Sequence, residues 1–246
     1  MFSKIGSISY LIFIALNSPV FFAGALAIWL ITLPFDKKKV ILQQYTCFWG
    51  SLHFWLVPTW RLKIIDRKNL KRKKTYMIVS NHQSQLDILV NFTLFAHFKI
   101  VSKKEIFQVP FIGWNMLLNN YIQLKRGDKK SIEEMIKNCE KSIDQGNSIF
   151  FYPEGSRSKD GEIKPFKLGA FSIAQKKKIP LLPILIDGTK DALPKHSLQS
   201  HGKHQITLKI LPEIPYEDFA DLPVEKTAEK VRNLMVKEFK SIKKEI

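Results

Sequence analysis

Most of the chain consists of two kinds of segment that follow one another. One kind is a short run of apolar or alternating apolar and polar residues, and the other has apolar residues at the spacing of a helix. The runs have the length and composition of β-strands, and they read WRLKII, TYMIVS, FKIVS, YIQLK, SIFFYP, PLLPILI and QITLKIL. Residues 131–145 and 224–246 instead carry apolar side chains at helical spacing. Ser131 and Glu134 form a capping box for the first of these helices, and Gly146 ends it. Strands alternating with helices predict an α/β fold, with a twisted, mostly parallel or mixed sheet flanked by helices.

The N-terminal part has a different pattern, because no charged residue occurs between Ile5 and Phe35. A bilayer is crossed by ~20 apolar residues, so this stretch is long enough to span one. Asn17, Ser18 and Pro19 interrupt it, and each half alone is too short to span. We therefore expect a re-entrant helical hairpin rather than a straight span.

A cleaved signal peptide is the alternative for this segment. Ala25-Leu26-Ala27 resembles a small-residue cleavage site, but the apolar run continues from Trp29 to Leu33, beyond any suitable cut. Lysines at positions 37, 38 and 39 follow the segment and favour a cytoplasmic position for the rest of the chain.

A second uncharged stretch, residues 40–60, is rich in aromatic side chains. Its aromatic residues include Phe48, Trp49, Phe54, Trp55 and Trp60, and its polar ones Gln43, Gln44, Thr46 and His53. This mixture is typical of an amphipathic helix lying in a membrane interface, and a core helix is the alternative. The apolar segment before it favours membrane contact. We expect residues 1–60 to form membrane-associating helices and residues 61–246 a separate α/β domain.

Composition and charge narrow the partners. The chain has 246 residues, 45% of them apolar, which is enough for a folded core, and a net charge of +17. That charge favours anionic partners: nucleic acid, acidic lipid, a phosphorylated substrate or an acidic carrier protein. The lysines are dispersed and no recognition module is visible, so nucleic acid is not expected. Cys47 and Cys139 cannot build a disulfide framework or a cysteine zinc site, which fits a reducing compartment.

The first polar motif, SNHQSQLDILV, begins at Ser80 directly after a strand run. Five residues on a helix turn a side chain by ~500°, so His82 must lie outside any helix in which Asp87 could reach it. Ser84 can cap a helix that begins here, with Asp87 in its first turn. The geometry then allows Asp87 to hold one ring nitrogen of His82 and leave the other free as a base. The alternative is a helix cap beside an unrelated loop histidine.

The second motif, YPEGSRS, follows the run SIFFYP. Arg157 offers a fork for a phosphate or carboxylate, and Gly155 allows backbone N–H groups to approach an oxyanion. A solvated turn with a local pair between Glu154 and Arg157 is the alternative. Polar segments after strands gather at one edge of an α/β sheet, so both motifs are expected there.

Together the motifs resemble those of the phospholipid and glycerol acyltransferase family, most closely its bacterial 1-acylglycerol-3-phosphate acyltransferases. N-H-x-S-x-x-D begins at Asn81, and PEGSRS, similar to P-E-G-T-R-S, follows about seventy residues later. SKKEIFQVPFIGW and YIQLKR resemble the second block, which ends at Arg126, and PFKLGAF and IPLLPILI resemble later blocks. The resemblance extends from Tyr76 to Asp187. Ser156 replaces the usual threonine, and Asn120 a common glycine.

The resemblance implies transfer of an acyl group from acyl-CoA or acyl carrier protein to the sn-2 hydroxyl of lysophosphatidic acid, a membrane lipid, giving phosphatidic acid. His82 and Asp87 would supply the base, without an acyl-enzyme, metal or cofactor. The remaining candidates bind substrate: Arg126, Arg157 and Lys103 the acceptor phosphate, Glu154 the acceptor or an arginine, and Gly155 and Ser156 the acceptor or the oxyanion.

The expected location is the cytoplasmic membrane, with the active site on its cytoplasmic face and the lysines against an anionic bilayer surface. Glycerol-3-phosphate or another lysophospholipid remains an alternative acceptor, and a non-catalytic protein that binds anionic lipid is the alternative to an enzyme. His196, His201 and His204 have spacing that allows zinc, but a polar loop is the simpler interpretation.

Overall fold

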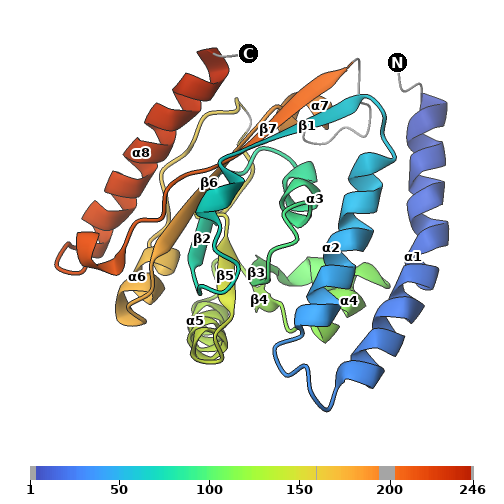
Figure 1. Ribbon diagram of the computed structural model, residues 1–246, viewed down its shortest axis with the longest axis horizontal. Coiled ribbons are helices and arrows are strands. Elements are labelled where there is room, and N and C mark those ends of the chain that lie inside the picture. Colours follow the sequence, from blue (N-terminus) through green and yellow to red (C-terminus); the bar gives the residue numbers. More distant parts are fainter. Residues whose placement is uncertain (1–3, 159, 194–202, 245–246) are drawn as a thin grey trace.

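A mixed seven-stranded sheet forms the centre of the protein, seen here in a computed structural model that describes residues 4–158, 160–193 and 203–244 (Figure 1). Its strands are β1 (Trp60–Ile65), β2 (Met77–Ser80), β3 (Phe98–Lys103), β4 (Ile122–Leu124), β5 (Ser148–Phe151), β6 (Leu181–Asp187) and β7 (His204–Ile210). The spatial order is β1-β7-β6-β2-β5-β3-β4, and every adjacent pair is parallel except β6 with β7. All the expected strands form, and the predicted α/β class is confirmed.

Helices cover both faces of the sheet because successive side chains on a strand point in opposite directions. Ile78 and Phe150 belong to the core beneath α2 (Val40–Trp55), α3 (Leu86–Phe92) and α4 (Ile112–Leu118). Met77 and Ile149 belong to the core on the other face, beneath α5 (Lys129–Asp144), α6 (Gly169–Lys176) and α8 (Val224–Lys244). The two helix layers lie on opposite sides of the sheet in Figure 1.

The first apolar segment forms one continuous helix, α1 (Lys4–Thr32), and the predicted hairpin within it is wrong. Pro19 cannot donate a backbone hydrogen bond, yet the helix passes through it. Asn17 and Ser18, just before the proline, donate side-chain hydrogen bonds to the carbonyls of Phe13 and Ile14 within the same helix. Residues 12–32 are apolar and long enough to cross a membrane by composition, and most of that stretch is not buried in the protein.

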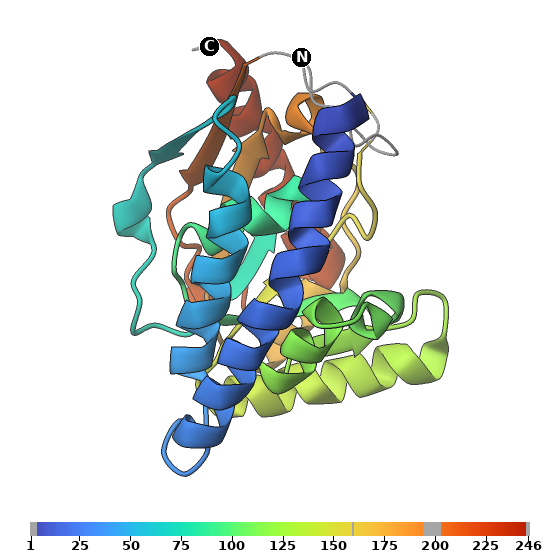
Figure 2. The ribbon, with the colours of Figure 1, turned by 90° about the vertical axis from the view of Figure 1, so that its right-hand side faces the viewer.

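The hairpin instead lies between α1 and α2, which run side by side in opposite directions (Figure 2). Phe21 stacks on Trp49 of α2, with ring centroids 5.6 Å apart. Asp36 in the connecting turn accepts hydrogen bonds from the first backbone N–H groups of α2. Lys99 of β3 is fully buried and donates to the carbonyl of Lys38, which fixes this turn to the sheet. Burial lowers the pKa of the Lys99 ammonium to about 7.

The aromatic helix α2 has two apolar faces. Leu42, Cys47 and Phe54 are buried, so the helix is part of the core as well as an edge of the protein. The opposite face exposes Ile41, Phe48 and Trp55. The expected interfacial helix is therefore also a core helix. The division into separate parts at residue 60 stays a prediction.

The ends of α5 differ in part from the predicted ones. Asp128, not Ser131, is the N-cap, because its carboxylate accepts from the backbone N–H of Ser131 over 3.0 Å. The helix therefore begins at Lys129, three residues before its apolar stripe starts at Ile132. Gly146 ends it with a φ of +78°, as its position predicted.

Candidate active site

The two polar motifs follow neighbouring parallel strands. The stretch after β2 carries His82, and the stretch after β5 carries residues 152–158. Parallel strands place their carboxyl ends at the same edge of the sheet, where loop and helix starts gather. A backbone hydrogen bond of 2.8 Å from the N–H of Ser158 to the carbonyl of His82 joins the two loops directly. The sequence prediction that both motifs meet at one edge is thus confirmed.

His82 and Asp87 form a hydrogen-bonded pair. Nδ1 of His82 lies 2.6 Å from Oδ2 of Asp87, and the Asp87 side chain is fully buried while the imidazole retains 18% exposure. The same carboxylate oxygen accepts the backbone N–H groups of Gln83 and Ser84, over 2.7 and 2.9 Å. A carboxylate in this role only accepts, so the proton of the pair belongs on Nδ1. Nε2 is then left with a free lone pair, as a general base requires.

The N-terminus of α3 has one of the two hydrogen bonds of the predicted capping box. Ser84 does not receive the N–H of Asp87 on its hydroxyl; its Oγ accepts from the backbone N–H of Leu86 and donates to the carbonyl of Leu193. Asp87 reaches back to the N–H of Ser84, which is the other half of the predicted box, and also to the N–H of Gln83. The helix start and the dyad are therefore one hydrogen-bonded unit, and the alternative of an unrelated loop histidine is not what the geometry shows.

Tyr152 covers one face of the His82 ring. The ring centroids lie 4.1 Å apart with an interplanar angle of 19°, and the Tyr152 hydroxyl accepts from the amide of Asn91 on α3. Burial, with the Asp87 charge as a smaller contribution, raises the pKa of the Tyr152 phenol well above its usual value, so the phenol stays neutral. The stack restricts rotation of the imidazole out of the plane that Asp87 sets.

Glu154 ties the two motifs together through backbone atoms. Its carboxylate accepts the N–H of His82 over 2.8 Å and the N–H of Lys164 over 3.2 Å. Each oxygen therefore accepts one backbone N–H, and the expectation that Glu154 orients the acceptor or braces an arginine stays a prediction. Burial raises the pKa of the Glu154 carboxyl to about 7, although both N–H bonds act in the opposite direction.

Gly155 adopts a φ of +69°, where a side chain would be strained and would also collide with Lys167. Its N–H donates to the carbonyl of Tyr152, so it is not free for an oxyanion in this structure. Ser156 and Arg157 follow it and are half-buried beside Lys164, whose ammonium donates to the carbonyl of Arg157. Three cationic side chains, at 157, 164 and 167, thus occur around this loop.

Arg126 and Lys103 lie farther out than Arg157. Lys103 is the last residue of β3, and Arg126 follows β4, whereas the dyad follows β2. Strands β5 and β3 lie between β2 and β4. Strands are spaced by about 4.8 Å, so Arg126 starts roughly 14 Å from the dyad strand. Both side chains are exposed, and Lys103 pairs with Glu105 over 3.3 Å. Asn120 has a φ of +55°, the conformation that a glycine at this position would favour.

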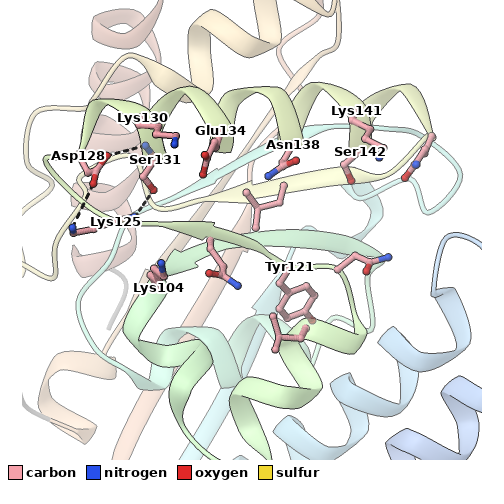
Figure 3. A pocket seen from close by; sticks show the side chains of 15 residues that line it. Lys104, Tyr121, Lys125, Asp128, Lys130, Ser131, Glu134, Asn138, Lys141 and Ser142 are labelled. Carbon is pink, nitrogen blue, oxygen red and sulfur yellow. Dashed lines mark hydrogen bonds and ion pairs between the residues drawn. The ribbon is translucent and has the colours of Figure 1, made fainter.

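A polar groove of about 670 Å³ lies beside β4 and beneath α5 (Figure 3). Lysines 104, 125, 130 and 141 and the acids Asp128 and Glu134 are among its lining residues. None of the predicted site residues lines it. The dyad therefore does not belong to this groove.

Neither cysteine is placed for chemistry. Burial raises the pKa of the Cys47 thiol to about 12 and that of the Cys139 thiol still further. No cluster of three metal-ligating side chains occurs among the described residues. His196 and His201, from the alternative zinc hypothesis, lie outside those residues.

Three residues that contact the site were missed from the sequence. Tyr152 precedes the PEGSRS motif, Lys164 follows it, and Thr189 donates its hydroxyl to Asp87 Oδ1 over 2.5 Å. The adjacency of Tyr152 to the motif was a usable signal. Nothing in the sequence pairs Thr189 with Asp87, because the contact spans 102 residues and depends on β2 and β6 being neighbours.

The chain is similar to several known proteins. Residues 61–187 match the model of the family described as Acyltransferase. The chain is 36% identical over 207 residues to the chloroplastic 1-acyl-sn-glycerol-3-phosphate acyltransferase BAT2 of Brassica napus, covering 82% of this chain and 59% of that protein. It is 38% identical to the chloroplastic 1-acyl-sn-glycerol-3-phosphate acyltransferase LPAT1 of Arabidopsis thaliana, covering 72% of this chain and 50% of that one.

A yeast relative matches over a larger share of its length. The 1-acyl-sn-glycerol-3-phosphate acyltransferase of Saccharomyces cerevisiae is 33% identical over 228 residues, which cover 90% of this chain and 73% of that protein. Against the two plant proteins, by contrast, the chain spans only half to three fifths of their length. The crystal structure of the 1-acyl-sn-glycerophosphate acyltransferase PlsC from Thermotoga maritima has the same fold, with a TM-score of 0.78 and 21% identity over 98% of this chain and 97% of that chain.

Proposed function

The chain belongs to the acyltransferase family, as its motifs predicted, and we propose that it transfers an acyl group from a thioester donor to the sn-2 hydroxyl of lysophosphatidic acid, giving phosphatidic acid. The observation that carries the proposal is the bond between His82 and Asp87 beside the loop of Arg157. The narrower likeness to bacterial members stays a prediction, since the curated relatives named above come from plants and a yeast.

His82 acts first as the base. Its free Nε2 takes the proton of the acceptor hydroxyl while the oxygen attacks the thioester carbonyl, and Asp87 stabilises the imidazolium that forms. The tetrahedral intermediate collapses, the C–O bond remains and the C–S bond breaks. A thiol has a pKa of ~8.5, so the sulfur leaves readily and recovers the proton from His82. The proposed reaction needs no metal or cofactor, and CoA or an acyl carrier protein is the donor's carrier.

Direct transfer fits the chain better than an acyl-enzyme. A nucleophilic cysteine is active as its thiolate, and burial disfavours the thiolate at both Cys47 and Cys139. The hydroxyl of Ser156 lies in the adjacent loop, but it accepts a hydrogen bond from the ammonium of Lys164 over 3.4 Å and does not donate to a base. His82 therefore serves the acceptor hydroxyl itself.

Cations around the second loop bind the acceptor's phosphate. Arg157 supplies a fork that matches phosphate oxygens, and its loop is bonded to the backbone of His82. In the acceptor, only a few covalent bonds separate the phosphate from the reacting hydroxyl. Arg157 is thus the primary phosphate ligand, while Arg126 and Lys103, on the outer strands, assist from farther away.

The acceptor's acyl chain lies in a bilayer, and one apolar side of the protein faces it. α1 exposes residues such as Leu16, Val20 and Ile31, α2 exposes the Phe48 face, and Trp114 of α4 packs on α1. These helices lie together on the side that Figure 2 presents. We propose that α1, which packs along α2 and α4, lies in one leaflet beside the domain instead of crossing alone. We also propose that the protein sits on the cytoplasmic membrane with its active site at the cytoplasmic face, a position that the lysines at 37, 38 and 39 favour.

Two other functions remain in competition. Glycerol-3-phosphate or another lysophospholipid would present the same hydroxyl and a phosphate, so the dyad does not discriminate among them. A non-catalytic protein that binds anionic lipid would use the apolar side and the lysines. It would have no use for an imidazole held by a buried carboxylate, and this pair favours the enzyme.

A parallel assay tests the proposal. Purified full-length protein receives radiolabelled acyl-CoA or acyl carrier protein, with lysophosphatidic acid, glycerol-3-phosphate or lysophosphatidylglycerol as acceptor. We expect labelled phosphatidic acid as the main product. Turnover confined to another acceptor would mean that the protein is an acyltransferase with that acceptor as its substrate. Binding of anionic vesicles without turnover on any acceptor would favour the non-catalytic lipid-binding protein.

A further inference from the structure

The end of β6 and the segment that follows it contact the dyad loop at three successive points. Asn81 exchanges two hydrogen bonds of 2.8 Å with the backbone of Ile186. Thr189 donates to Asp87 over 2.5 Å, and Leu193 accepts from the hydroxyl of Ser84 over 2.7 Å. The last two contacts lie beyond residue 187, where the family match ends. Thr189 and Leu193 therefore hold the dyad loop from outside the residues that carry the motifs.

A glycine turn aims Thr189 at the dyad. Gly188 has a φ of +85°, and a Cβ at this position would lie 2.3 Å from the carbonyl oxygen of Gln205 on β7. Only glycine permits both the backbone conformation and this close approach. The turn leads into α7 (Thr189–Ala192), whose first residue is fully buried. The position of the Thr189 hydroxyl is thus set by the sheet rather than by a free loop.

The two oxygens of Asp87 have different partners. Oδ2 serves His82 and two backbone N–H groups, all from the five residues before it, whereas Oδ1 accepts the hydroxyl of Thr189. Asp87 is fully buried, so an Oδ1 without this donor would lose a hydrogen bond that water cannot readily replace. Rotation of the carboxylate to seek another donor would move Oδ2 away from the imidazole.

We propose that Thr189 is a positioning residue of the catalytic dyad, which fixes the rotation of the Asp87 carboxylate and through it the tautomer of His82. Thr189 touches no substrate in this role. It acts on the chemical step through Asp87, and acceptor binding is unaffected. The kinetic part of this inference rests on the proposed acyl transfer.

Thr189→Val tests the role, since valine keeps the shape and removes the hydroxyl. We expect kcat to fall about 10- to 100-fold, the range for a lost hydrogen bond to a charged group, with KM for both substrates within about twofold. Thr189→Ser restores the donor and should recover most of kcat. Thr207→Val is the matched control: Thr207 is buried on neighbouring β7, its hydroxyl has no hydrogen-bond partner among the described residues, and kcat should not change.

A second measurement needs no turnover and so separates this inference from the proposed function. Nitrogen-15 NMR of labelled histidine reports which ring nitrogen carries the proton. We expect neutral His82 to carry its proton on Nδ1 in the wild type, in Thr189→Ser and in Thr207→Val. Thr189→Val should show a mixture of the two tautomers. Full kcat, or an unchanged tautomer, in a folded Thr189→Val protein would overturn the proposal. If that variant unfolds, Thr189→Ala takes its place in both measurements.

Discussion

The backbone N–H of His82 donates a hydrogen bond of 2.8 Å to the carboxylate of Glu154, which lies 72 residues later in the chain. The other Glu154 oxygen accepts the N–H of Lys164. A single buried side chain thus sets the distance between the base and the loop that carries the cations. Removal of the Glu154 carboxylate would loosen both loops at once, although this residue has no direct role in proton transfer.

Glu154 makes stability depend on pH. Burial raises its folded pKa to about 7 from the ordinary value of 4.5, so the folded protein keeps this proton when the unfolded chain has already lost it. Stability contributed by this group therefore declines as pH rises from about 4.5 to 7, by roughly 3 kcal/mol. Glu154→Gln should flatten that decline in thermal melts recorded across this range.

Glu154→Gln should also lower the free energy of unfolding by an amount that does not depend on pH. An amide has only one oxygen, so one of the two backbone N–H groups would face an NH₂ group, which costs about 1–3 kcal/mol. Glu133→Gln, on the exposed face of α5, is the control and should leave the pH dependence unchanged. An unaltered slope in the Glu154→Gln melts would contradict the raised pKa.

The dyad predicts a graded loss of activity. His82→Ala should lower the rate of transfer by ~10²–10⁴-fold, because it removes the base that takes the proton of the acceptor hydroxyl, and the fold should persist. Asp87→Asn should lose less, since the ring remains but its tautomer and orientation are no longer fixed. Single-turnover rates with a fluorescent thioester donor, alongside circular dichroism, check both. Wild-type turnover in a folded His82→Ala protein would remove the mechanism.

The cations predict an effect that decreases with distance. Arg157→Ala should lower kcat/KM for the acceptor by the equivalent of ~1.5–3 kcal/mol, the range for hydrogen bonds to charged groups. Arg126→Ala should lower it less, since its strand is the third from that of the dyad. The donor's KM should change little in either variant. Kinetics with each substrate varied separately decide this, and a defect confined to the donor would reassign Arg157.

Local sequence patterns predicted the strands and the dyad. They did not predict features that depend on contacts between segments far apart in the sequence. The short apolar run TYMIVS predicted β2, a strand with apolar neighbours on both faces. Ile78 belongs to the core on one face of the sheet, and Met77 belongs to the core on the other. Pro19 appeared to break a helix, but neighbouring side chains and packing against α2 keep it continuous. Thr189 reaches Asp87 only because β6 lies beside β2, and strand order has no local signal.

The exposed face of α2 predicts how the enzyme meets its substrate. Phe48 and Trp55 are each about half exposed, so transfer of both rings into a bilayer should contribute about 1 kcal/mol apiece. Phe48→Ser with Trp55→Ser should therefore weaken binding to anionic vesicles by roughly tenfold or more. Activity on vesicle-borne lysophosphatidic acid should fall with it, while activity on a short-chain monomeric acceptor should persist, because the dyad does not include either ring.

The matched control uses the opposite helix layer. Ile132 and Leu222 are also exposed apolar side chains, but they belong to α5 and the turn before α8, on the other face of the sheet. Ile132→Ser with Leu222→Ser removes exposed apolar side chains from that face and should leave vesicle binding intact. Equal losses in the two double variants would mean that the protein has no single membrane-facing side. A loss confined to the α2 pair would place the bilayer against α1, α2 and α4, the same layer from which α3 presents Asp87 to His82.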